Sequence, residues 1–136
     1  MSYGFFGMSS PREMLDKAKR ELSKMKSDLN PDTIFNFFVT TYHVMDYVKT
    51  ATRVPSPSAI KDMYDDEDFK MCQFVCNQGK HSILRTVTPY SAFADGPSGG
   101  DVIYEIVDGS NRAAVLHLGD KLIAKWEKFF LDNAIS

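Results

Sequence analysis

Between Ile34 and Val48 the chain is apolar around almost the whole circumference of a helix, and this segment constrains the fold more than any other. Ten of its fifteen residues are aliphatic, aromatic or methionine. Asn30 and Pro31 stand just before it, in the cap and first-turn positions of a helix. A helix that is apolar on every side belongs in the middle of a bundle or against a second subunit. The segment therefore predicts a central helix, and its excess apolar surface predicts a homodimer.

The other predicted helices are amphipathic, and each begins at a recognisable signal. Ser10, Pro11 and Glu13 form a capping box, after which apolar residues recur every three or four positions as far as Leu29. Further helices are predicted at 57–63, from the acidic run 65–68 to a C-terminal Gly79, and from 111 to about 131. Gly119 costs helix stability, so it predicts a close helix–helix approach.

The periodicity changes between the last two helices. Residues 82–93 and 102–107 are rich in β-branched and aromatic side chains, and the segment 94–100 between them is a glycine-rich loop. We expect a mainly α fold: a bundle of four to five helices with a β-hairpin inserted before the C-terminal helix. Residues 1–10 are predicted to be an N-terminal tail, and 11–136 a single domain.

Composition excludes several classes of protein. The chain has 136 residues, a net charge of −2 and 16 basic against 18 acidic residues, so it lacks the basic excess typical of nucleic-acid binders. No apolar stretch is long enough to span a membrane, and no secretory signal precedes the domain. With two cysteines in all, Cys72 and Cys76, we expect free thiols and a cytoplasmic location. The spacing of His and Cys fits no standard metal site, so no metal or cofactor is predicted.

One group of polar residues is a candidate for chemistry. His43 and Asp46 are three positions apart and share a helix face, while Lys80 and His81 follow the end of a later helix. If the two helices pack side by side, histidine could transfer a proton, Asp46 could orient it and Lys80 could hold an anion. Asn77 and Arg85 complete the set as ligand-binding residues. The structural alternative is that His43 bonds Asp46 in the core and that Lys80 and His81 complement the helix end.

Three segments carry a resemblance to known proteins. Residues 35–48, 76–81 and 126–130 resemble a group of uncharacterised small bacterial and phage helical proteins. The order of elements is also similar to the HEPN domains, many of which are dimeric, metal-independent ribonucleases of defence systems. Their motif is an arginine, four to six residues and a histidine. No arginine stands at that spacing before His81, where Asn77 and Lys80 are the nearby polar residues.

Two functions follow from these observations. The first is a small non-catalytic interaction or regulatory protein, from a phage, mobile-element or defence locus as the resemblance implies, with a protein partner. The second is a HEPN-like enzyme that processes RNA or nucleotides with His43, Asp46, Lys80 and His81. A shared fold does not transfer an activity, so the positions of these side chains must decide between them.

Overall fold

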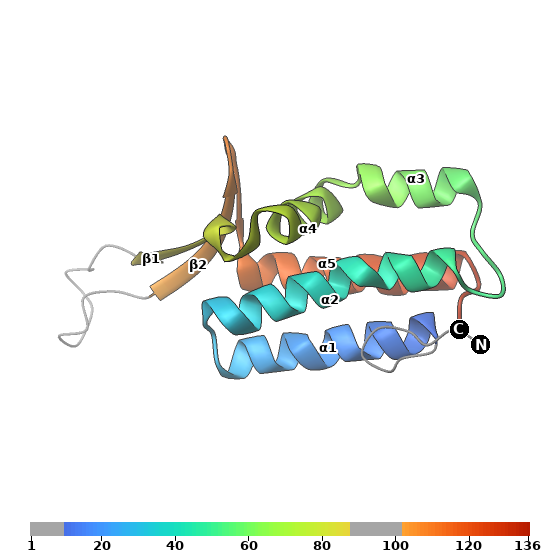
Figure 1. Ribbon diagram of the computed structural model, residues 1–136, viewed down its shortest axis with the longest axis horizontal. Helices are drawn as coiled ribbons and strands as arrows, with labels where there is room; N and C mark the ends of the chain where they lie inside the picture. The colour runs from blue at the N-terminus through green and yellow to red at the C-terminus, as the bar shows by residue number, and fades with distance from the viewer. Residues whose placement is uncertain (1–9, 88–101) are drawn as a thin grey trace.

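The computed structural model describes residues 10–87 and 102–136, and in these residues the chain is mainly α-helical with a small antiparallel sheet before the last helix, as predicted. The helices lie side by side, and the sheet stands at one end of them (Figure 1). The elements are α1 (Pro11–Ser27), α2 (Pro31–Lys49), α3 (Pro57–Asp65), α4 (Glu67–Gln78), the 3-10 helix η2 (Gly79–Ser82), β1 (Ile83–Val87), β2 (Val102–Asp108), β3 (Asn111–Ala114) and α5 (Val115–Asp132). Residues 1–9 of the predicted tail 1–10, residues 88–93 of the predicted first strand and the predicted loop 94–100 lie outside the described residues.

Local signals in the sequence set where the first three helices begin. The side-chain oxygens of Ser10, Asn30 and Ser56 each accept a hydrogen bond from a backbone N–H of the following first turn. A proline follows each of these caps, at a position where its missing N–H costs no helical hydrogen bond. These interactions lie within a few residues of one another, which explains why the helix starts were predictable.

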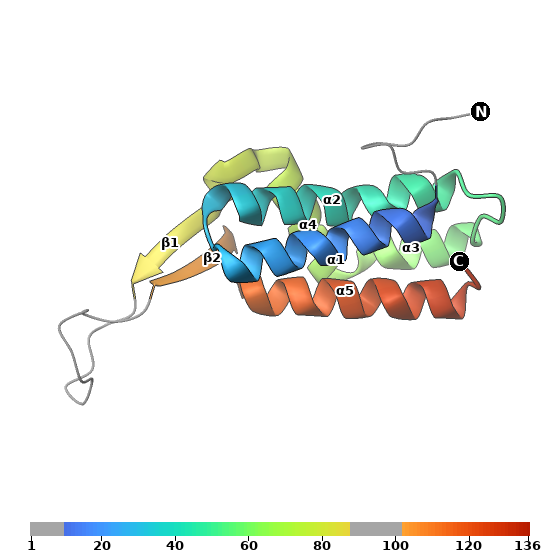
Figure 2. The ribbon, with the colours of Figure 1, turned by 90° about the horizontal axis from the view of Figure 1, so that it is seen from below.

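The apolar helix α2 is central, as its composition predicts. It packs against α1, α4 and α5, so that neighbours cover it on several sides (Figures 1 and 2). Its buried apolar side chains are Ile34, Phe37, Phe38, Val44, Met45, Tyr47 and Val48. Most of the apolar surface that suggested a homodimer is therefore buried within one chain, while Phe35, Val39 and Tyr42 are half-buried. The homodimer stays a prediction.

Gly119 is the point at which α5 comes close to the α1–α2 pair. A Cβ atom at this position would lie 3.0 Å from Leu22 Cδ1, 3.2 Å from Met25 Cε and 3.3 Å from a ring carbon of Phe37. Glycine allows α5 to approach both helices without displacing these side chains. The close approach predicted from a glycine within a helix is confirmed.

The sheet has the order β1-β2-β3, and its third strand corrects the sequence prediction. We expected the last helix to begin at Asn111, but residues 111–114 pair with β2, and α5 begins at Val115. Asp108 lies opposite Asn111, which leaves a two-residue turn at 109–110. Gly109 adopts a φ of 61°, which tight hairpin turns require and glycine accepts without strain. The pair Gly109-Ser110 was thus a hairpin signal.

One face of the sheet packs on the helices and the other faces outward. Ile83 and Ile106 are directly opposite each other and buried, so their face belongs to the core. Because side chains alternate along a strand, Leu84 and Glu105, the next opposed pair, point to the outer face. There the Arg112 guanidinium pairs with Glu105 at 3.1 Å.

Candidate functional site

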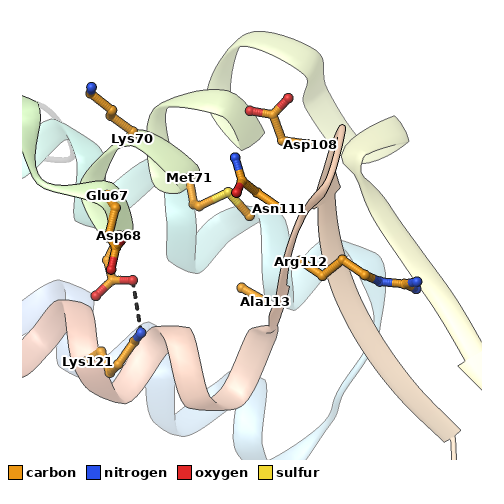
Figure 3. A pocket seen from close by; sticks show the side chains of 9 residues that line it. All are labelled: Glu67, Asp68, Lys70, Met71, Asp108, Asn111, Arg112, Ala113 and Lys121. Atoms are coloured by element: carbon orange, nitrogen blue, oxygen red, sulfur yellow. Dashed lines mark ion pairs between the residues drawn. The ribbon is translucent and has the colours of Figure 1, made fainter.

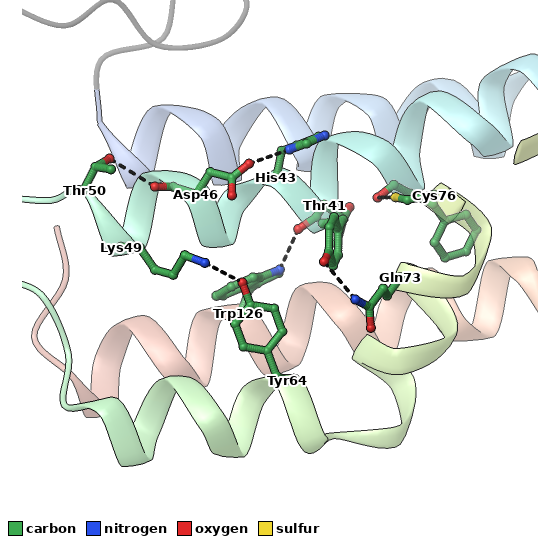
Figure 4. Close-up of polar contacts among 11 residues, drawn as sticks. Thr41, His43, Asp46, Lys49, Thr50, Tyr64, Gln73, Cys76 and Trp126 are labelled. Atoms are coloured by element: carbon green, nitrogen blue, oxygen red, sulfur yellow. Dashed lines mark hydrogen bonds and ion pairs between the residues drawn. The ribbon is translucent and has the colours of Figure 1, made fainter. Parts of the chain in front are cut away.

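His43 and Asp46 form the polar pair that their spacing predicts. Both project from α2, and His43 Nδ1 lies 2.6 Å from Asp46 Oδ2 (Figure 4). An ionised carboxylate can only accept hydrogen bonds, so the proton of this contact belongs to Nδ1. Their side chains are 31% and 47% exposed, and the pair lies at the surface of the bundle. The geometry therefore orients the imidazole but does not bury it in a cleft.

The other predicted site residues lie near the end of α4 and the beginning of α2, away from His43 and Asp46. Lys80 donates to the Asp32 carboxylate at the start of α2, and its neighbour His81 is exposed. Asp32 precedes His43 by eleven residues on the same helix, a separation of about 16 Å along the axis. The structure thus brings the end of α4 to the beginning of α2, away from His43. Asn77 is also exposed, at the end of α4.

Helices α2 and α4 do pack side by side, but side chains fill the space between them. Gln73 Nε2 donates to the Tyr42 hydroxyl at 3.2 Å, and the Tyr42 ring stacks on Phe69 with centroids 5.3 Å apart. Burial raises the pKa of Tyr42, which keeps its hydroxyl protonated as a hydrogen-bonding group. Beyond Tyr42, both cysteines of α4 contact the Phe38 carbonyl. The predicted location of a pocket between the two helices is therefore occupied by a packed interface.

A polar pocket lies elsewhere, between the beginning of α4, the β2–β3 turn and α5. Its volume is about 330 Å³ (Figure 3). It is lined by Glu67, Asp68, Lys70, Met71, Asp108, Asn111, Arg112, Ala113 and Lys121. Charges of both signs line it, and Asp68 already pairs with Lys121 at 3.0 Å, so the pocket presents no single charge to a ligand.

Asp68 is the buried centre of an ion-pair cluster that joins α4 to α5. Its side chain is only 8% exposed and also accepts a contact from Lys125 at 2.6 Å. Lys125 pairs in addition with Asp66, the residue that caps α4. The acidic run 65–68 predicted a helix start, which the structure confirms, but it did not predict these ion pairs. Lys121 and Lys125 lie four positions apart on the last helix. The sequence could not identify them as partners of Asp68, because it does not show that α4 and α5 are neighbours.

This cluster predicts a pH-dependent contribution to stability. Burial raises the pKa of Asp68, but hydrogen bonds from Lys125 and Lys121 outweigh it, and the pKa lies below the ordinary value of 3.8. A carboxyl group with a lowered pKa in the folded state stabilises the protein above its unfolded pKa, and loses this contribution as the pH falls through the folded value. Asp68→Asn is expected to lower the free energy of unfolding by about 2 kcal/mol at neutral pH.

Urea denaturation at a series of pH values measures this effect. The difference between wild type and Asp68→Asn should shrink below a pH of about 3.8, as the wild-type carboxyl group takes up its proton. Asp65→Asn is the control, because Asp65 is exposed and pairs with Lys61 within its own helix. That variant should remain close to wild type. A difference for Asp68→Asn that stays constant through this range would contradict the assignment.

The arginine–histidine spacing of HEPN nucleases is absent before His81 but present at His117, where four residues separate it from Arg112. His117 is exposed in the first turn of α5. The Arg112 side chain is turned away from Asp68 and Lys121 (Figure 3) and pairs with Glu105. Both histidines therefore belong in a test of ribonuclease activity.

The described residues can be searched for a metal site and for a membrane-spanning helix. Within residues 10–87 and 102–136, no group of three or more His, Cys, Asp or Glu side chains is arranged to hold a metal ion. In the same part of the chain, every helix is too short or too polar to cross a membrane.

The chain matches no protein-family model, no curated protein and no solved structure.

Proposed function

We propose that this chain is a non-catalytic interaction protein that binds an extended segment of a partner polypeptide along strand β1. The observation that carries the proposal is the open edge of the sheet. In the order β1-β2-β3, one side of β1 has no neighbouring strand among the described residues. An edge strand presents unpaired backbone N–H and C=O groups, and extended peptides bind such edges by adding a strand.

The side chains of β1 suggest the chemistry of that segment. Leu84 is 43% exposed although it is apolar, and Arg85 beside it is exposed on the opposite face of the strand. No carboxylate of the described residues pairs with Arg85, in contrast to Arg112 two strands away. Directly opposed charges on neighbouring strands stabilise the pairing, so the complementary segment alternates apolar and acidic residues. This role agrees with the prediction that Arg85 contacts a ligand.

The distribution of the candidate catalytic residues supports the same proposal. His43 and Asp46 are partly exposed to solvent in the C-terminal half of α2. Lys80, in contrast, pairs with Asp32 at the beginning of the same helix. General acid–base catalysis requires its groups within hydrogen-bond reach of one reacting atom. A separation of about 16 Å along α2 does not allow this for the two halves of the predicted set.

A charge swap tests the proposal. Fluorescence anisotropy of a labelled short peptide alternating valine and glutamate should report binding to wild type, and its valine–lysine counterpart should bind more weakly. Arg85→Glu should reverse this preference, with a change of about tenfold in affinity for each peptide, the equivalent of about 1.4 kcal/mol. Arg53→Glu is the matched control, because Arg53 is exposed in the connection between α2 and α3.

Two results would overturn the proposal. One is that wild type binds neither peptide or does not distinguish the glutamate from the lysine version. The other is catalysis: incubation with total RNA should leave the RNA intact. Cleavage by wild type that is lost in His81→Ala or in His117→Ala would instead support the HEPN-like alternative.

A further inference from the structure

Strand β1 has a composition that favours pairing with a second copy of itself, except at one residue. Its sequence, Ile-Leu-Arg-Thr-Val, contains three aliphatic residues and a threonine, of which the β-branched ones are typical of strands. Among the described residues, no strand lies beside β1 on the edge that faces away from β2. The β1–β2 hairpin projects past the ends of α1 and α2, so these helices leave that edge accessible (Figure 2). Such an edge is a template for association between copies of a chain.

The position of Arg85 in the strand determines what a second copy would meet. Two copies of one edge strand form a closed, two-fold symmetric pair when they run antiparallel. The register that pairs all of Ile83–Val87 places Ile83 opposite Val87 of the second copy. Arg85, the central residue, then lies opposite Arg85 of the second copy. Directly opposed residues have Cβ atoms about 4.5–5.5 Å apart, and like charges at that position destabilise the pairing.

The charge of Arg85 is not neutralised by a neighbouring group of the described residues. Its directly opposed neighbour on β2 is Tyr104, which is uncharged at neutral pH. Glu105 lies opposite Leu84 and therefore points to the other face of the sheet, where it pairs with Arg112. Arg85 is exposed and forms no ion pair within the described part of the chain. Two paired edges would therefore bring two uncompensated guanidinium groups together.

We propose that Arg85 excludes a second copy of this chain from strand β1. In a single chain the exposed guanidinium is solvated, and it opposes association only when an identical edge approaches. The proposal concerns this edge alone, so a dimer that forms through another surface is compatible with it. It rests on the place of Arg85 in β1 and does not depend on the peptide binding proposed above. It implies that a copy with an acidic residue at position 85 can pair with wild type.

Mixing wild type with Arg85→Glu tests this exclusion. Sedimentation velocity of the equimolar mixture should show a species larger than any in either protein alone, because each protein alone opposes like charges. Arg85→Thr removes both charges and should self-associate about tenfold more tightly than wild type. The matched control is a mixture of wild type with Arg53→Glu, which makes the same charge change at an exposed residue between α2 and α3. This mixture should sediment like wild type, and circular dichroism checks that all variants are folded.

Salt separates the charge pair from unspecific association. Raising the salt concentration should weaken the pair of wild type with Arg85→Glu, since exposed charges are screened, and should leave the Arg85→Thr pair largely unchanged. The proposal is wrong if the Arg85→Glu mixture forms no larger species than the Arg53→Glu mixture, or if that species is insensitive to salt. It is also wrong if Arg85→Thr associates no more than wild type. No peptide is present in these experiments, so their failure is distinct from a failure of the peptide test.

Discussion

Trp126→Ala is expected to lower the free energy of unfolding by about 4 kcal/mol, because deleting a buried tryptophan side chain typically costs 3–5 kcal/mol. Trp126 is 0% exposed and is among the largest fully buried side chains of the described core. A domain of this size has a total stability of about 5–15 kcal/mol. The variant should therefore show a large fall in the midpoint of urea denaturation, or be partly unfolded without denaturant.

The large effect follows from the number of elements that meet at this side chain. The indole ring makes edge-to-face contacts with Phe69 of α4 at 5.6 Å and with Phe130 of its own helix at 6.0 Å. Its Nε1–H donates to the Thr41 carbonyl oxygen of α2 at 3.0 Å (Figure 4). Truncation leaves a cavity at the junction of three helices, which the surrounding side chains cannot close completely.

Trp126→Phe separates the two contributions to this effect. Phenylalanine keeps much of the aromatic contact but loses the indole N–H, so its cost should be clearly smaller than that of alanine. Urea denaturation of both variants, with circular dichroism as the signal, measures the difference. Equal losses for phenylalanine and alanine would show that the hydrogen bond dominates. A loss below about 1 kcal/mol for alanine would contradict the central position of this residue in the core.

Gly119→Val should be the second most damaging change, with an expected loss of about 2–3 kcal/mol. The first added carbon would already lie 3.0–3.3 Å from side chains of α1 and α2. Two further methyl groups would force α5 away from those helices. Valine is a better helix former than glycine, but that gain is only a few tenths of a kcal/mol and does not offset the overlap.

Ala124→Val provides the matched control for this prediction. It introduces the same side chain into the same helix, at a position that is exposed. Its cost should be limited to the lower helix propensity of valine, about 0.5 kcal/mol. Thermal or urea unfolding of the two variants isolates the effect of the close approach. If both lose the same amount, the packing of α5 at Gly119 tolerates a larger side chain, and the steric argument is wrong.

The candidate site shows where sequence interpretation stops. The pairing of His43 with Asp46 was predictable, because a spacing of three residues on a helix fixes the contact. The distance from this pair to His81 was not predictable, because it depends on the position at which α4 packs along α2. The salt bridge of Lys80 with Asp32 and the packing of Gln73 against Tyr42 settle that position.

The sequence by itself determined the features that arise from residues close together in the chain: the helix starts at Ser10, Asn30 and Ser56, the apolar character of α2 and the need for glycine at 119. Only the tertiary structure decided which helix faces meet. It placed Asp68 between two lysines of α5 and turned the residues before that helix into a third strand. The physical reason is that caps and periodicity act over one or two turns. Packing joins side chains tens of residues apart, and no local pattern specifies their partner.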